Sequence, residues 1–132
     1  MFLDSTILIE LARRGWDDPF AQKVREFVGG EPAFCSAIQL GEVADHARRI
    51  GGLPAEWVSR TREAVEIVPV DEESAVEASE IKAEARRSKE GRHFSLIDGV
   101  ILASARRRGQ RLLTTAKEFS GFADATIVDA AT

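Results

Sequence analysis

Short apolar runs alternate along the chain with longer segments whose apolar residues recur at helical spacing. The short runs are bounded by Gly, Pro or charged residues, as is typical of short buried strands. Pro69 lies inside the third run and predicts a strand end or an edge strand there, because proline cannot donate to a strand ladder. The five predicted strands cover residues 2–3, 33–35, 67–70, 111–114 and 126–128.

The segments between these runs predict helices. Gly29 is expected to end the first of three clear patterns. Asp71 is expected to cap a second helix that continues to about Lys89, and a third is expected from Ser95 to Gly109. Residues expected to face inward are Phe20, Val24, Phe27 and Val28 on the first helix, Ala75, Ala78, Ile81 and Ala85 on the second, and Leu96, Val100, Leu102 and Ala103 on the third.

Strands and helices in alternation predict a parallel sheet with helices packed on both faces. The chain has 132 residues, which suffices for one sizeable core and is too short for two. The fold class expected is therefore α/β: one domain over residues 1–132, a three-layer α/β/α structure with a central parallel sheet of four or five short strands.

Composition narrows the class of protein. The 18 basic and 22 acidic residues give a net charge of −4, which argues against non-specific DNA binding through a basic surface. No apolar run is long enough to cross a membrane, and the first residues lack the pattern of a signal peptide. The single cysteine, Cys35, excludes an internal disulfide and a cysteine-based zinc site. We therefore expect a cytoplasmic protein.

Four acidic residues lie near ends of the predicted elements. Asp4 directly follows the first strand, and Glu42 lies in the helix after the second. Asp98 lies in the first turn of the helix before the fourth strand, and Glu118 follows that strand. Ligands of open parallel α/β sheets bind beyond the carboxyl ends of the strands, at the switch in strand order. These four acids are therefore candidates for one site.

Each acid also has a purely structural interpretation. Asp4 could cap the helix that follows it, and Glu42 could be an exposed helix residue. Residues 95–98 and 115–118 both have the form of a capping box. Asp98, however, lies among apolar residues without a Lys or Arg one turn away. Burying an unpaired carboxylate costs several kcal/mol, so a divalent cation is the partner that the pattern favours.

At these residues the chain resembles a PIN domain and, more narrowly, the toxin of a VapBC-type toxin–antitoxin pair. The resemblance covers essentially the whole chain and has the family's usual order of motifs. Its four segments are Phe-Leu-Asp-Ser-Thr at 2–6, the helix entry at 36–42, Phe-Ser-Leu-Ile-Asp with the apolar run after it at 94–103, and Leu-Leu-Thr-Thr leading to Glu-Phe at 112–119.

The resemblance implies a Mg²⁺- or Mn²⁺-dependent endoribonuclease that forms a homodimer and is held inactive by a small antitoxin of the VapB type. Asp4, Glu42 and Asp98 match the first three acids of the family by position, and are expected to bind the metal. Where the family commonly has a fourth aspartate this chain has Ala116. Glu118 has one methylene more than aspartate, so it could reach the site from a different backbone position and complete the catalytic set.

The sequence also offers candidates for contact with RNA. Ser5 and Thr115 could supply hydroxyl groups to the substrate, although both could equally cap helices. Arg92 belongs to a basic group with Arg86, Arg87 and Lys89 that precedes the Asp98 helix and could hold the RNA backbone.

A PIN fold that has lost activity and acts by binding RNA or protein is the serious alternative, and Ala116 is its main support. A phosphoacceptor receiver domain would have an acidic pair after the first strand, where only Asp4 stands. A phosphatase of the Asp-x-Asp type would have a second aspartate at Thr6.

Overall fold

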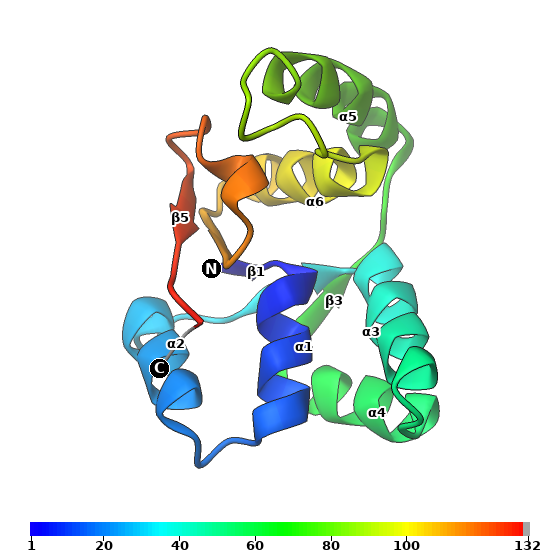
Figure 1. Ribbon diagram of the computed structural model, residues 1–132, viewed down its shortest axis with the longest axis vertical. Coiled ribbons are helices and arrows are strands. Elements are labelled where there is room, and N and C mark those ends of the chain that lie inside the picture. The colour runs from blue at the N-terminus through cyan, green and yellow to red at the C-terminus, as the bar shows by residue number, and fades with distance from the viewer. Residues whose placement is uncertain (131–132) are drawn as a thin grey trace.

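The computed structural model describes residues 1–130. Its centre is a sheet of five strands, all parallel, in the order β3-β2-β1-β4-β5 (Figure 1). The predicted α/β class and parallel sheet are confirmed. The strands are β1 (Phe2–Leu3), β2 (Phe34–Ser36), β3 (Glu66–Val68), β4 (Leu112–Thr114) and β5 (Ala125–Ile127).

Helices cover both faces of this sheet. Figure 1 shows α5 and α6 on one side, with α1 to α4 on the other. No helix within residues 1–130 is long and apolar enough to cross a membrane. The helices are α1 (Ser5–Arg14), α2 (Pro19–Val28), α3 (Ala37–Arg49), α4 (Pro54–Ala64), α5 (Glu72–Ala85) and α6 (Leu96–Arg107), and a 3₁₀ turn, η1 (Lys117–Phe119), follows β4.

The core has two parts, one on each face of the sheet. Successive residues of a strand point to opposite faces, so Phe2 of β1 packs toward α5 and α6 while Leu3 packs toward the other helices. The first part includes Leu3, Ile7, Leu8, Leu11, Phe20, Val24, Cys35, Val43, Trp57 and Leu113. The second includes Phe2, Phe34, Ile81, Phe94, Ile101, Leu102, Leu112, Phe119 and Phe122.

Several predicted boundaries were wrong by a few residues. Helix α5 ends at Ala85, not near Lys89, because the chain turns back there: the Arg86 side chain donates to the carbonyl of Phe94 at 2.9 Å, and Gly91 packs directly against Ala85. Strands β2 and β5 are shifted by one residue from the prediction. Strand β3 stops before Pro69 and lies at the sheet edge, as the proline predicted.

Three inward-facing residues were also predicted wrongly. Ala75, Phe27 and Leu96 are exposed, and Ser74 takes the inward position expected of Ala75. The buried residues of α5 are small or aliphatic and lie three and four positions apart: Ser74, Ala78, Ile81 and Ala85. The alanines of this helix are spread around it, so the sequence was compatible with more than one inward face, and the contact with α6 selects this one.

The close packing of α5 on α6 depends on Gly99. A Cβ atom at Gly99 would lie 2.5 Å from the carbonyl oxygen of Ala78 and 3.0 Å from its Cα. We expect Gly99→Ala to lower the free energy of unfolding by about 1–3 kcal/mol, because the helices must separate to admit the methyl group. Urea unfolding measures this change.

Gly41 provides the matched control, because it is also inside a helix but a Cβ there would meet nothing within 4 Å. Gly41→Ala should raise the free energy of unfolding by about 0.5–1 kcal/mol through helix propensity alone. Equal effects of the two substitutions would contradict the packing constraint at Gly99.

Candidate active site

Asp4 lies where the strand order of the sheet reverses. From β1 the chain moves to β2 and β3 on one side, and it later returns to β4 on the other side of β1. The backbone N–H of Asp4 donates to the carbonyl of Leu113 at 2.9 Å, which fixes the residue at the end of both central strands. The switch point of an open parallel sheet is where such folds bind ligands.

The carboxylate of Asp4 is held by two threonine hydroxyls. Its Oδ2 accepts hydrogen bonds from Thr114 Oγ1 at 2.7 Å and from Thr6 Oγ1 at 2.9 Å. Although Asp4 stands at the start of α1, its side chain makes no capping hydrogen bond. The capping interpretation of Asp4 therefore does not describe the structure, and the side chain points to a polar cluster instead.

Burial raises the pKa of Asp4 to about 6, and only 2% of the residue is exposed. The hydrogen bond from Thr114 opposes this rise, while the nearby charge of Asp98 adds to it. A carboxylate that is buried close to another carboxylate is costly to ionise without a cation.

Glu42 reaches the same region from α3. Ser5 Oγ donates a hydrogen bond to Glu42 Oε1, which joins the start of α1 to the middle of α3. Burial raises the pKa of Glu42, the hydrogen bond from Ser5 opposes the rise, and the charge of Asp98 adds to it. Glu42 is therefore partly buried and is not the fully exposed helix residue of its structural interpretation.

Asp98 completes the capping box that the sequence predicted. Its Oδ2 accepts from the backbone N–H of Ser95 at 2.8 Å, and its own N–H donates to Ser95 Oγ at 3.0 Å. Burial raises the pKa of Asp98, these hydrogen bonds oppose the rise, and the charge of Glu118 adds to it. The cap uses Oδ2 and not Oδ1, so a role at the helix end does not exclude a role in the site.

All four predicted acids line one cavity of about 230 Å³. They come from four different elements or their ends, which only the fold brings together. Ser5 lines the same cavity, and Ala116 and Glu118 lie together on its wall. The complete lining is Asp4, Ser5, Thr6, Ile9, Glu42, Asp45, Arg49, Asp98, Ala116 and Glu118.

Two predicted substrate-binding residues do not line this cavity. Thr115 is half-buried, and its backbone N–H donates to Thr6 Oγ1 at 3.1 Å. Arg92 is exposed, and its Nε lies 3.2 Å from Nε2 of the adjacent His93. Their contact with substrate stays a prediction that the geometry of the cavity does not support.

Three residues that matter to the site were missed in the sequence. Thr6 and Thr114 orient Asp4, and their position beside the ends of β1 and β4 was the available signal. Gln39 is fully buried: its Nε2 donates to the carbonyl of Leu3 at 2.6 Å, and its Oε1 accepts from the N–H of Ser36 at 2.8 Å. The Ser-x-x-Gln pattern at 36–39 is a capping-box signature, and it was the signal that could have indicated the bond between Gln39 and Ser36.

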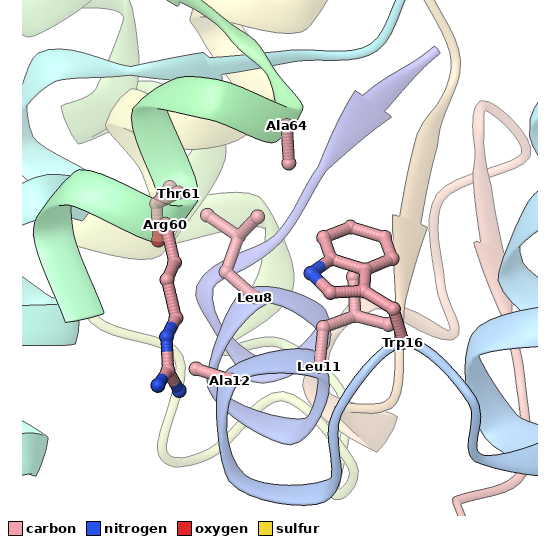
Figure 2. A pocket seen from close by; sticks show the side chains of 7 residues that line it. All are labelled: Leu8, Leu11, Ala12, Trp16, Arg60, Thr61 and Ala64. Carbon is pink, nitrogen blue, oxygen red and sulfur yellow. The ribbon is translucent and has the colours of Figure 1, made fainter. Parts of the chain in front are cut away.

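A second cavity, between α1 and α4, has a different character (Figure 2). It measures about 10 Å³ and is lined mainly by apolar groups, and no carboxylate borders it. Such a space is a packing gap too small for chemistry. Its lining is Leu8, Leu11, Ala12, Trp16, Arg60, Thr61 and Ala64.

The donor set of the acid cavity suits a hard divalent cation. Carboxylate oxygens are the protein ligands that Mg²⁺ and Mn²⁺ prefer. Within residues 1–130, no Lys, Arg or His forms an ion pair with Asp4, Glu42, Asp98 or Glu118. Among the described residues, no three His, Cys, Asp or Glu side chains are close enough together to hold a metal ion as they stand. The residues fit a cation by chemistry and charge, and binding one requires these carboxylates to move closer together.

The raised pKa of Asp4 predicts how stability depends on pH without metal. The pKa of Asp4 is near 3.8 in the unfolded chain and about 6 in the folded protein. At pH values between these two, the folded protein keeps a proton that the unfolded chain has lost. The resulting stabilisation is complete below about pH 4 and is lost as the pH rises through 6. Above that pH the ionised carboxylate opposes folding.

Asp4→Asn should remove this dependence. At pH 7, without metal, the variant is expected to be more stable than the parent by about 1–3 kcal/mol, and near pH 4 the two should be alike. Urea unfolding of both proteins between pH 4 and 7.5, with a chelator, gives the difference. A difference that does not change with pH would contradict the raised pKa.

The chain belongs to the PIN domain family, whose model matches residues 1–125. The family resemblance inferred from the four sequence motifs is confirmed. A search of the curated proteins found no match.

Solved structures share the fold at low sequence identity. VapBC2 from Rickettsia felis, bound to a DNA fragment from its promoter, is 14% identical with a TM-score of 0.72, over 97% of this chain and 96% of that one. DNA-bound VapBC from Salmonella typhimurium is 21% identical with a TM-score of 0.67, over 97% and 96%. VapC20 from Mycobacterium tuberculosis, a toxin that cleaves the sarcin–ricin loop, is 18% identical with a TM-score of 0.65, over 98% and 90%.

Proposed function

We infer that the protein is a Mg²⁺- or Mn²⁺-dependent endoribonuclease and the toxin of a type II toxin–antitoxin pair. The observation that carries this inference is the acid cavity: four carboxylates lie around it at the switch point of a PIN fold, three of them with a raised pKa. Structural likeness to VapBC toxin–antitoxin complexes and to the VapC20 toxin supports the biological setting.

Asp4, Asp98 and Glu42 are the residues that would hold the metal, and Glu118 would extend the set where Ala116 lacks a carboxylate. When bound, a divalent cation would lower the pKa of a water molecule and neutralise charge on the scissile phosphate. A carboxylate site of this kind needs no histidine as general base.

The residues around the acids fix their orientation. Thr114 and Thr6 both donate to Oδ2 of Asp4, and these two hydrogen bonds restrain the orientation of its carboxylate. Ser5 is committed to Glu42 by its hydrogen bond, which supports a positioning role for this hydroxyl. Ligands whose partners fix their orientation bind metal more tightly than free ones.

Partners are proposed on the same basis. A small antitoxin of the VapB type is expected, since the structural neighbours include such complexes. A homodimer is expected because Ile38, Leu96 and Ile97 are exposed at the N-terminal ends of α3 and α6, the helices that carry Glu42 and Asp98. Cytoplasmic localisation is proposed with the toxin function.

An inactive PIN domain that only binds RNA or protein is the second candidate, and Ala116 favours it. A cleavage assay separates the two: the folded protein is incubated with a panel of single-stranded RNAs in Mg²⁺, Mn²⁺ or a chelator. Cleavage that requires the metal supports the nuclease. RNA binding without cleavage under any of the metal conditions would favour the second candidate.

A further inference from the structure

One basic residue lies on the wall of the acid cavity. Five carboxylates line this cavity, those of Asp4, Glu42, Asp45, Asp98 and Glu118, and Arg49 is the single Lys or Arg among the lining residues of the described chain. A phosphate group that approaches five carboxylates is repelled, and a divalent cation would offset only part of their charge. A substrate with a phosphate backbone therefore needs a cation at this rim.

Helix α3 places Arg49 at the outer end of the cavity. Glu42, Asp45 and Arg49 are three and four residues apart and so share one face of the helix. Seven residues of α-helix separate Glu42 from Arg49, which is about 10 Å along the axis. A long, flexible arginine side chain can span part of this distance, so Arg49 would meet a phosphate beside the one at the acids.

Arg49 is only weakly engaged in the free protein. Its Nε lies 3.5 Å from Oδ2 of Asp45, and the two side chains are 67% and 68% exposed. Surface ion pairs of this kind contribute little to stability and exchange readily. A guanidinium group binds phosphate oxygens through two parallel hydrogen bonds, so it can leave Asp45 for a phosphate.

The other basic groups are placed differently. Arg86, Arg87, Lys89 and Arg92 do not line the cavity. Further arginines lie at the C-terminal end of α6, where Arg106 pairs with Asp124 at 2.6 Å and Arg107 pairs with acids of α5. These residues can contribute to the electrostatic potential around the protein, but they do not line the acid cavity.

We propose that Arg49 binds a backbone phosphate of single-stranded RNA at the rim of the acid cavity, and that Asp45 competes with RNA for it. This proposal rests on the proposed function for its substrate class. It adds a residue of this chain that composition and motifs did not single out.

The test is binding of a fluorescein-labelled single-stranded oligoribonucleotide, measured by anisotropy across a range of salt concentrations in Mg²⁺. The proteins carry Asp98→Asn so that the RNA stays intact, which a gel verifies. Arg49→Gln should weaken binding about fivefold at low salt and reduce the slope of log K against log salt by about 0.7, the value for one phosphate contact to a single strand. Arg49→Lys should retain the slope.

Arg48→Gln is the matched control, because Arg48 is exposed in the same last turn of α3 but does not line the cavity. It should leave the slope unchanged. Equal effects of Arg48→Gln and Arg49→Gln would overturn the proposal, since both would then act only through net charge.

Asp45→Asn tests the competition. It should tighten RNA binding about twofold to threefold when Arg49 is present and have a smaller effect in the Arg49→Gln background. An equal effect in both backgrounds would overturn the role given to Asp45. Failure of the parent to cleave RNA would count against the proposed nuclease, whereas a salt slope that depends on Arg49 would still support the rim contact.

Discussion

Asp98→Asn is expected to lower the rate of RNA cleavage by at least about a hundredfold while leaving the protein folded. The substitution removes one negative charge from the acid cavity and keeps the shape of the side chain. The amide oxygen of asparagine can still accept the hydrogen bond from the N–H of Ser95, so the start of α6 should persist. The loss would therefore come from the metal site and not from the helix.

Asp71→Asn is the control that separates these two causes. Asp71 also caps a helix, since its Oδ1 accepts from the N–H of Ser74 at 2.6 Å, but it does not line the acid cavity. It should cleave RNA at the rate of the parent. Single-turnover cleavage of one RNA by the three proteins gives the comparison, and an Asp98→Asn protein as active as the parent would contradict the assignment of Asp98.

Gln39→Leu is expected to lower the free energy of unfolding by about 2–5 kcal/mol, the largest effect on stability expected of the substitutions considered. Strands β1 and β2 pair at Phe2 and Phe34, and their ladder does not extend to Leu3 and Cys35. The Gln39 amide links the ends of these strands, because its Nε2 donates to the Leu3 carbonyl and its Oε1 accepts from the Ser36 N–H. Leucine has a similar volume but would leave both backbone groups buried without these partners.

Urea unfolding measures the effect, with Gln22→Leu as control because Gln22 is exposed on α2. The control should change stability by less than about 0.5 kcal/mol. A Gln39→Leu protein within 1 kcal/mol of the parent would show that the amide does not replace the strand ladder. Because Leu3 precedes Asp4, the variant is also expected to bind metal less tightly.

The sequence predicted the order of elements and the meeting of the acids because both depend on local signals. Apolar runs place the strands, and the parallel topology then brings the ends of β1 and β4 together, with Asp4 and Glu118 beyond them. The same signals could not choose the inward face of α5. Its alanines allow several faces, and the choice of Ser74 over Ala75 depends on contacts with α6.

Long-range polar contacts were beyond the sequence. The hydrogen bond from Thr114 to Asp4 joins residues far apart in the chain, and nothing local to either indicates it. The capping-box pattern at 36–39 could have indicated the bond of Gln39 to Ser36, but its hydrogen bond to the Leu3 carbonyl joins residues far apart in the chain. Asp98 shows that a local interpretation and a functional one can both apply, since the capping box forms and the residue also lines the cavity.

The claim that the acid cavity binds a divalent cation can be tested without knowing the RNA target. Mn²⁺ is titrated into metal-free protein at pH 7.5, and the electron paramagnetic resonance signal of free Mn²⁺ reports the bound fraction. We predict saturable binding by the parent and by Asp17→Asn, an exposed acid outside the cavity. Asp4→Asn and Asp98→Asn should each weaken binding by at least about tenfold. Binding of equal strength by all four proteins would contradict the account.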